Sequence, residues 1–314
     1  MEAESSTKGN NIFKGHDKCT PKKCFFRSVE SDGTTYKTQH HPSCHDKDSP
    51  EPKTCTQIGP DLLLLKQEIQ RGNIPLLEYK IDNITNQKVV NVVEHTPYKS
   101  YATISHVWAD GYGNPAANKL WTCQLDFFRT LIEKGNLKDP QQRNPLFWID
   151  TLAIPVHDDY KEERRMAIRK IHEIYTNAKF TIVIDNGLSQ MSSGSTYQET
   201  AMKILASGWM RRLWTLQEAY LSRRLLFAFA DEELRNLDDL EELYPQANNV
   251  LTSNIPTAAR NYFHNLLGPD RRARINEVAP ATGFGLLASV WRAAQWRVSR
   301  HAPPEAQGLF RNVT

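Results

Sequence analysis

The sequence predicts an α/β fold with a mainly parallel sheet flanked by helices, because strand-like runs alternate with helix-length segments from residue 98 onward. The strand-like runs are short, apolar and rich in β-branched residues, and they are residues 101–108, 146–154, 180–184 and 225–230. The segments between them carry apolar residues at helical spacing, as in residues 120–135, 162–178 and 208–222. Parallel strands joined by crossover helices account for this alternation.

Composition divides the 314 residues into four parts. They are an irregular, Cys/His-containing arm at 1–60, a helix and hairpin at 61–97, the alternating strands and helices at 98–232, and a helical extension at 233–314. Within them we expect a helix over 61–74 and a hairpin turn over 83–87. A Ser-rich surface loop is expected at 190–200, and a helical pattern covers 231–244.

Charge and hydropathy exclude several classes of protein. The net charge of +3 is small for this length and does not indicate a nucleic-acid partner. The leucine run Leu62–Leu65 is far too short to cross a bilayer, and residues 1–11 lack the apolar core of a secretion signal. We therefore expect a cytoplasmic protein that binds neither nucleic acid nor membrane.

The cysteines are odd in number, and four of the five precede residue 56, where histidines also gather. In a reducing compartment such a cluster favours metal over disulfides. The candidate ligands of a structural zinc ion in the arm are Cys19, Cys24, His41, Cys44 and Cys55. The sequence contains no CxxC pair, so the alternative of a polar arm with incidental cysteines remains open.

Polar and aromatic residues follow the predicted strands, where open parallel sheets bind their ligands. Ser105 and Trp108 end the first strand, Asp150 ends the second, and a predicted helix after the third carries Trp214 and Glu218. Asp150 is also a plausible helix cap and the tryptophans plausible core residues. Neighbouring strand residues point to opposite faces, so Ser105 and the following histidine cannot form a nucleophile–base pair. The GxSxG, Walker and GxGxxG patterns are absent.

Three blocks together resemble the fungal heterokaryon-incompatibility (HET) domain. They read YATISHVW at 101–108, FWIDTLAIP at 147–155 and WMRRLWTLQE at 209–218, in the order and spacing of that family. One departure is Ala153, which stands where the family usually has cysteine. The resemblance therefore gives no support to a cysteine nucleophile at this position.

The resemblance implies a role in fungal non-self recognition, in which such proteins trigger death of fused, incompatible cells. The HET domain in turn resembles the TIR domain, which has a flavodoxin-like sheet, and many TIR domains cleave NAD⁺ with a glutamate four residues after a tryptophan. Trp214 and Glu218 match that spacing. The resemblance thus implies a flavodoxin/TIR-like sheet and NAD⁺ as substrate, with no cofactor required.

Two functions follow as alternatives. In the first, the chain is an NAD⁺ glycohydrolase with the catalytic residues Glu218 and Asp150 and the substrate-binding residues Ser105, Trp108, Gly111, Arg212 and Trp214. In the second, it is a non-enzymatic signalling module that acts through self-association or a recognition partner. A domain that binds a nucleotide without cleaving it is a third possibility.

Overall fold

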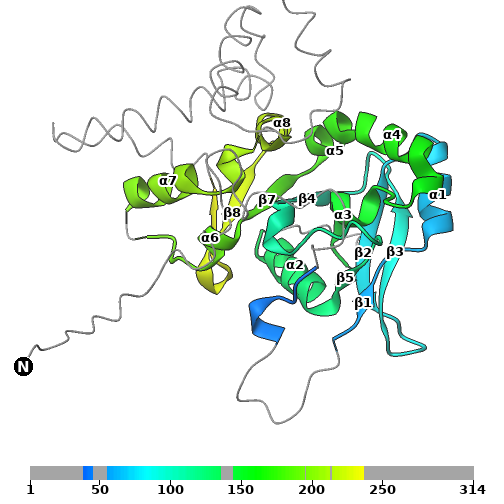
Figure 1. The fold of residues 1–314 in the computed structure, drawn as a ribbon, viewed down its shortest axis with the longest axis horizontal. Coiled ribbons are helices and arrows are strands. Elements are labelled where there is room, and N and C mark those ends of the chain that lie inside the picture. Colours follow the sequence, from blue (N-terminus) through cyan, green and yellow to red (C-terminus); the bar gives the residue numbers. More distant parts are fainter. Residues whose placement is uncertain (1–37, 45–54, 136–143, 195, 213, 237–314) are drawn as a thin grey trace, which may run out of the picture.

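The computed structural model describes residues 38–44, 55–135, 144–194, 196–212 and 214–236, which build one mixed sheet with helices on both faces (Figure 1). The strands of the sheet are β2 (Pro75–Ile81), β3 (Lys88–Glu94), β4 (Tyr101–His106), β6 (Leu146–Trp148), β7 (Phe180–Ile184), β8 (Leu225–Ala228) and β9 (Leu234–Asn236). Their order across the sheet is β3-β2-β6-β4-β7-β8-β9.

The centre of this sheet is parallel and its margins are antiparallel. Strands β6, β4, β7 and β8 run parallel to one another. The β2–β3 hairpin joins β6 in antiparallel fashion, and β9 does the same at β8. The α/β prediction is confirmed, whereas the sheet as a whole is mixed rather than mainly parallel.

Eight α-helices accompany the sheet in the described residues. They are α1 (Leu62–Gln70), α2 (Thr122–Lys134), α3 (Asp150–Ala153), α4 (Lys161–Arg169), α5 (Ile171–Asn177), α6 (Asn186–Ser189), α7 (Tyr197–Ala206) and α8 (Trp214–Leu221). A separate two-stranded ribbon pairs β1 (Gln57–Ile58) with β5 (Leu120–Trp121). No helix among the described residues is long and apolar enough to cross a membrane.

Alternation along β4 assigns the helices to the two faces of the sheet. His106, on the same face as Ala102 and Ile104, contacts the ring of Tyr112, which packs against Phe128 of α2 with ring centroids 5.6 Å apart. The Tyr101 hydroxyl, on the opposite face, donates a hydrogen bond of 2.7 Å to the carbonyl of Ile174 in α5. Successive strand residues point to opposite faces. Helix α2 therefore covers one face, and α5 with its neighbour α8 covers the other (Figure 1).

The best-predicted strand is β7, which has the expected bounds Phe180–Ile184 and is buried along its whole length. A strand with parallel neighbours on both sides reads as a continuous apolar run. The hairpin is also confirmed, and Asp82 shapes its turn by accepting the backbone N–H groups of Ile84 and Thr85 at 3.0 and 2.7 Å. The structure of these elements is therefore predictable from a few neighbouring residues in the sequence.

Five predicted elements differ from the structure, and one of them is the helix expected over 208–222, which consists of the 3₁₀ turn Trp209–Arg211 followed by α8. The strand expected over 146–154 ends at Trp148, because Asp150 begins α3 and its carboxylate accepts the Thr151 N–H at 2.6 Å. The helix expected over 162–178 is two helices, α4 and α5, which meet at Lys170.

The other two differences lie near the end of the described chain. The loop expected at 190–200 gives way to α7, whose N-cap Thr196 accepts the Glu199 N–H at 3.2 Å. The helical pattern at 231–244 contains β9 within its described part. The irregular arm before residue 38 and the extension after residue 236 lie outside the described residues.

Candidate functional site

Two carboxylates meet at the carboxyl end of β4, each bound by one of the last two residues of that strand. The Ser105 hydroxyl donates a hydrogen bond to Glu218 Oε2. His106 Nε2 lies 2.8 Å from Asp150 Oδ1. Because Ser105 and His106 point to opposite faces, the strand end holds one acid on each side. The structure thus brings both predicted catalytic residues to the predicted edge of the sheet.

Glu218 is positioned by a chain of polar contacts beneath α8. The indole N–H of buried Trp209 donates to Ser105 Oγ at 2.5 Å, so this hydroxyl directs its own hydrogen toward Glu218. At the end of the helix, Ser222 Oγ lies 2.5 Å from both Thr181 Oγ1 and the Glu218 carbonyl oxygen. Helix α8 is therefore attached to the sheet by hydrogen bonds at the residue that carries the acid.

Asp150 is fixed by hydrogen bonds from three residues. Trp108 Nε1 donates to Oδ2 at 2.7 Å, and the Thr151 backbone N–H and His106 Nε2 reach Oδ1 at 2.6 and 2.8 Å. The other imidazole nitrogen of His106 is buried and has no hydrogen-bond partner within the described part of the chain. Since Nδ1 has no acceptor there, His106 is held through its Nε2–H, which donates to the Asp150 carboxylate.

The loop after β4 holds Trp108 in place. A Cβ atom on Gly113 would lie 2.6 Å from the Trp108 indole, so only glycine permits this close packing. Gly111 adopts φ +95°, and its carbonyl accepts hydrogen bonds from Gln124 Nε2 at 2.9 Å and the Gln39 N–H at 3.0 Å. The structure therefore places Trp108, predicted as substrate-binding, in contact with Asp150, and Gly111, predicted likewise, in the loop next to Trp108, whose carbonyl accepts the Gly111 N–H at 3.2 Å.

Their surroundings push the pKa values of the two acids apart. Burial, aided by the charge of Asp150 and opposed by the Ser105 hydrogen bond, raises the pKa of Glu218 to about 7. Burial also raises the pKa of Asp150. This effect is outweighed by the charge and hydrogen bond of His106, together with the Trp108 hydrogen bond, which lower the Asp150 pKa to about 2. At neutral pH Asp150 is ionised, while Glu218 exists in both protonation states.

Both acids keep access to solvent despite their many contacts. The Asp150 side chain is 35% exposed, and Glu218 is partly exposed. Arg212, also partly exposed, lies close enough to Glu218 for its charge to lower the pKa of that acid. Trp214, one helical turn before Glu218 on α8, is 39% exposed. The charges of Asp150 and Arg212 thus both act on Glu218, and an exposed indole lies one helical turn before it.

The sequence reasoning missed four residues around the acids: His106, Asp110, Tyr175 and Trp209. Buried Tyr175 interacts through its hydroxyl with both Ser105 and Glu218. Burial raises the pKa of Asp110 to about 6, and its carboxylate accepts the Asn186 N–H at 2.8 Å. Tyr175 lies on an apolar helical stripe and Trp209 in a predicted helix, so neither showed a local sign of its polar contact.

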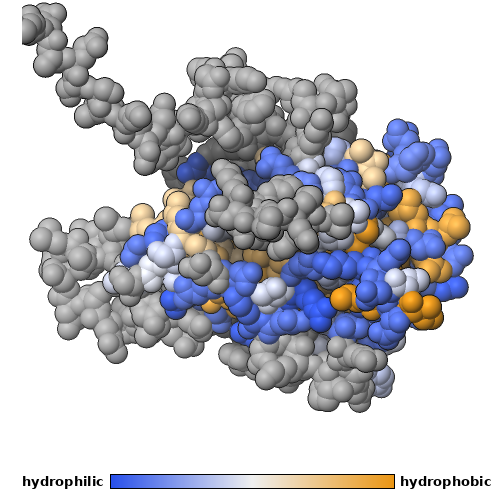
Figure 2. Space-filling model, turned by 90° about the horizontal axis from the view of Figure 1, so that it is seen from below, coloured by the Kyte–Doolittle hydropathy of each residue, from blue (hydrophilic) through white to orange (hydrophobic). Residues whose placement is uncertain are grey.

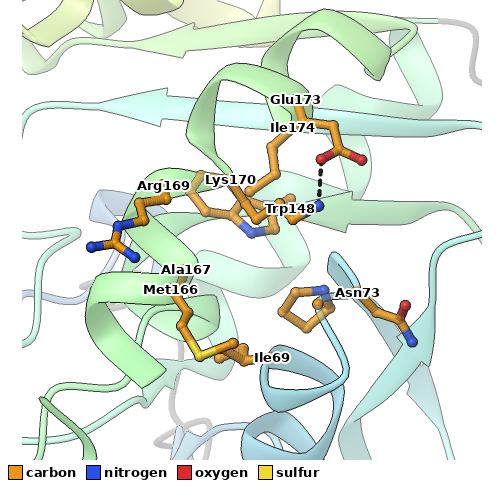
Figure 3. A pocket seen from close by; sticks show the side chains of 11 residues that line it. Ile69, Asn73, Trp148, Met166, Ala167, Arg169, Lys170, Glu173 and Ile174 are labelled. Atoms are coloured by element: carbon orange, nitrogen blue, oxygen red, sulfur yellow. Dashed lines mark hydrogen bonds and ion pairs between the residues drawn. The ribbon is translucent and has the colours of Figure 1, made fainter. Parts of the chain in front are cut away.

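A pocket of about 420 Å³ lies beside these residues but does not include either acid (Figure 3). Residues of α1, α4, α5 and β6 line it, among them Ile69, Asn73, Trp148, Met166, Lys170 and Ile174. Lys170 is paired with Glu173 at 2.6 Å (Figure 3). The Trp148 ring packs edge-on against Tyr175 with ring centroids 5.9 Å apart. These two aromatic residues stand between the pocket and Glu218.

A second group of chemically reactive side chains lies on the α2 side of the molecule. His40, Cys44, Cys55 and Cys123 bring their ligand atoms within 4.8 Å of one another, and we call them the thiol–imidazole cluster. This cluster can hold a metal ion. It contains the predicted ligands Cys44 and Cys55, and it adds His40 and Cys123, which the sequence reasoning did not select.

Of the other three predicted ligands, His41 is the one that lies within the described residues, and its side chain is not part of the cluster. The His41 ring stacks on Phe127 with centroids 4.2 Å apart. Cys19 and Cys24 fall outside the described residues. His40, rather than its neighbour His41, belongs to the cluster because the short helix Pro42–Cys44 brings His40 and Cys44 together.

Comparison with known proteins supports the family resemblance. The model of the family described as "Heterokaryon incompatibility protein (HET)" matches residues 101–196. No curated protein and no solved structure matches the chain significantly. The matched range spans β4 to the N-cap of α7 and thus includes Ser105, His106 and Asp150, while Glu218 follows it. Residues 101–196 of this chain are a heterokaryon incompatibility (HET) domain, which suggests a role in heterokaryon incompatibility.

Proposed function

We propose that this protein is a cell-death effector of fungal non-self recognition that cleaves NAD⁺ to nicotinamide and ADP-ribose at Glu218 and Asp150. The observation that carries the proposal is the pair of solvent-accessible carboxylates at one strand end, with pKa values of about 7 and about 2. Pairs of acids whose surroundings separate their pKa values are typical of sites that stabilise or transfer charge in glycosidic cleavage.

The chemistry requires negative charge next to the ribose. When the C1′–N bond of NAD⁺ breaks, its electron pair stays on the nicotinamide nitrogen and positive charge develops on the sugar. Ionised Glu218 would stabilise this charge and accept hydrogen bonds from ribose hydroxyls. Asp150, ionised across the physiological range, would orient the ribose or the attacking water. Water then adds to C1′ and releases one proton to solvent.

Nicotinamide leaves as a neutral molecule and needs no proton from the protein. The active form of Glu218 is therefore its carboxylate, and its raised pKa limits how much of that form is present at neutral pH. A bound cation favours the ionised state of a nearby acid. The pyridinium of NAD⁺ would accordingly help to prepare the site that cleaves it.

Two further residues suit the remainder of the substrate. The guanidinium of Arg212 would pair with the pyrophosphate, to which its planar geometry is matched. The exposed indole of Trp214 offers a face for the pyridinium, a contact typically worth ~0.5–2 kcal/mol. Trp108 is less suited to this role because its indole nitrogen is bound to Asp150 and Gly113 packs against its ring.

The test measures nicotinamide release from NAD⁺ by the full chain at high protein concentration, with and without a crowding agent. Glu218→Gln keeps the shape of the side chain and removes its charge, so we expect turnover to fall at least ~100-fold. The matched control is Glu162→Gln, since Glu162 is exposed on α4 and paired only with Arg165 among the described residues. Unchanged turnover by folded Glu218→Gln would refute the mechanism.

A non-enzymatic assembly module is the second candidate, and one observation favours it. Leu63 and Leu64 at the start of α1 are 65% and 48% exposed. Figure 2 shows further apolar residues among hydrophilic ones on the side of the molecule that carries α1, β2 and β3. Exposed apolar residues of this kind can mark a contact surface. Cell death that persists with Glu218→Gln, at constant cellular NAD⁺, would support this function instead.

A further inference from the structure

The thiol–imidazole cluster uses none of the residues of the Glu218–Asp150 site and joins three distant segments of the chain. His40 and Cys44 flank a short helical turn, Cys55 precedes β1, and Cys123 lies in the first turn of α2. We propose that the cluster is a structural zinc site in which His40 Nδ1 and the sulfur atoms of Cys44, Cys55 and Cys123 bind one Zn²⁺ ion.

The distances within the cluster match a zinc tetrahedron. Zn–S bonds of ~2.3 Å and Zn–N bonds of ~2.05 Å place neighbouring ligand atoms ~3.8 Å apart for two sulfurs and ~3.6 Å apart for nitrogen and sulfur. His40 Nδ1 lies 3.5 Å from Cys44 Sγ and 3.7 Å from Cys123 Sγ. Both nitrogen–sulfur distances therefore match a zinc site, and all four ligand atoms lie within 4.8 Å of one another.

The donor set favours zinc over calcium and magnesium. Three thiolates and one imidazole form a closed structural zinc site, whereas calcium and magnesium prefer oxygen ligands. The competing explanation is a disulfide, and none joins the described cysteines. Three thiols cannot all form disulfides with one another, because one would remain. One bound cation, by contrast, would be coordinated by all three sulfur atoms and by the imidazole.

The surroundings of the cluster orient its ligands. The His41 backbone N–H donates to Cys123 Sγ at 3.2 Å, and the Thr122 hydroxyl lies 3.3 Å from Cys55 Sγ. The His40 ring stacks on Trp121 with centroids 3.8 Å apart. Hydrogen bonds to ligand sulfurs and packing against ligand rings are typical of metal sites, where they fix the ligand geometry.

The zinc ion would brace the loop that supports the candidate catalytic site. Next to His40, the Gln39 N–H donates to the Gly111 carbonyl at 3.0 Å, and the Thr38 hydroxyl donates to the Gly113 carbonyl at 2.5 Å. Gly113 in turn packs against Trp108, the residue that binds Asp150. Zinc at the cluster would therefore hold residues 38–44 against this loop, a structural role that does not depend on NAD⁺ cleavage.

The test is elemental analysis of the full chain, purified in reducing buffer without chelator. We expect about one zinc ion per chain, as for a closed Cys₃His site. The neighbouring histidines give a matched pair of variants. His40→Ala removes a ligand and should weaken zinc binding at least ~10-fold. His41→Ala keeps the backbone N–H to Cys123 and should retain zinc.

Cobalt provides a measurement that needs no variant. Co²⁺ added to the metal-free full chain should give the visible absorption of a tetrahedral site together with thiolate-to-cobalt charge transfer, and zinc should displace it. A chain that holds no zinc after purification and takes up neither metal would overturn the proposal and leave a hydrogen-bonded thiol cluster. Retention of zinc by His40→Ala with loss in His41→Ala would overturn the ligand set.

Discussion

Ser105 and Glu218 lie 113 positions apart in the sequence, and the hydroxyl of the first donates a hydrogen bond to the carboxylate of the second. Ser105 Oγ itself accepts a hydrogen bond from the Trp209 indole N–H at 2.5 Å, while its own hydrogen is donated to Glu218. The pair therefore connects the middle strand of the sheet to the helix that carries the candidate catalytic acid. The hydrogen bond positions the Glu218 carboxylate.

Ser105→Ala should remove the hydrogen bond that joins β4 to the Glu218 carboxylate. The Ser105 hydrogen bond lowers the Glu218 pKa, so its removal should raise that pKa further and shift the pH dependence of NAD⁺ cleavage upward. Trp209 Nε1 also loses its acceptor, which should cost ~1–3 kcal/mol of unfolding free energy. Urea denaturation and a pH–rate profile measure the two effects. An unchanged profile would separate Ser105 from the function of Glu218.

The raised pKa of Glu218 makes a prediction about stability that does not depend on catalysis. A folded-state pKa of about 7 exceeds the ordinary value of 4.5, so the folded protein binds this proton more tightly than the unfolded chain does. The resulting stability is complete below about pH 4.5 and is lost as the pH rises through about 7.

Glu218→Gln removes this titration and still accepts the Ser105 hydrogen bond. Relative to wild type, it should gain ~1–3 kcal/mol of unfolding free energy between pH 4.5 and pH 8, after allowance for the partial exposure of the side chain. Chemical denaturation at the two pH values measures the difference. A constant difference would show that the Glu218 pKa is not raised.

The catalytic rate of wild type should rise with pH through about 7, because the carboxylate is the active form.

Asp150 should have the opposite pH signature and a larger structural cost. Its pKa of about 2 lies below the ordinary 3.8, so its stabilising contribution is present above pH 3.8 and is lost as the pH falls toward 2. Asp150→Ala leaves the donors of His106, Trp108 and Thr151 without their acceptor and should cost about 3 kcal/mol at pH 7.

Asp150→Asn retains one acceptor oxygen and should cost about 1 kcal/mol less than the alanine variant. The control is Asp159→Ala, because Asp159 lies on the surface beside His157 and its loss should change stability by less than ~0.5 kcal/mol. Thermal unfolding of the three variants gives the order. Equal stability of Asp150→Ala and Asp159→Ala would show that Asp150 is not part of a binding network.

The sequence predicted those features whose physical cause is local. Strand β7 is an uninterrupted apolar run because it is covered on both faces, and the hairpin turn is shaped by Asp82 within three residues. The start of α7 was missed although Thr196 and Glu199 have the spacing of a capping box, because the surrounding serines suggested a loop. The capping-box spacing was thus present in the sequence, but the serine-rich composition was given more weight.

Other features depend on contacts between distant residues and leave no local pattern. Cys123 has the helical spacing of an apolar core residue, yet its sulfur lies among ligands from two segments nearly seventy or more positions away. The pairing of His106 with Asp150 spans 44 positions. The edge of the sheet where Asp150 and Glu218 meet was predictable, since ligands of parallel sheets bind at the carboxyl ends of strands. The partners that set their pKa values were not.

Trp214→Ala should separate substrate binding from folding. Trp214 is 39% exposed, so its removal should lower the unfolding free energy by less than ~1 kcal/mol. If its indole stacks on the pyridinium of NAD⁺, the same change should weaken binding by ~2–30-fold, the equivalent of ~0.5–2 kcal/mol. Trp214→Phe should recover part of this loss because it restores an aromatic face.

Trp209→Phe is the contrasting variant, because Trp209 is buried and its indole N–H donates to Ser105. This change should reduce turnover and stability together. Calorimetric titration with NAD⁺ and thermal unfolding distinguish the two tryptophans. Unchanged affinity in Trp214→Ala would remove this indole from the binding site and leave Arg212 as the remaining candidate for substrate contact on this side.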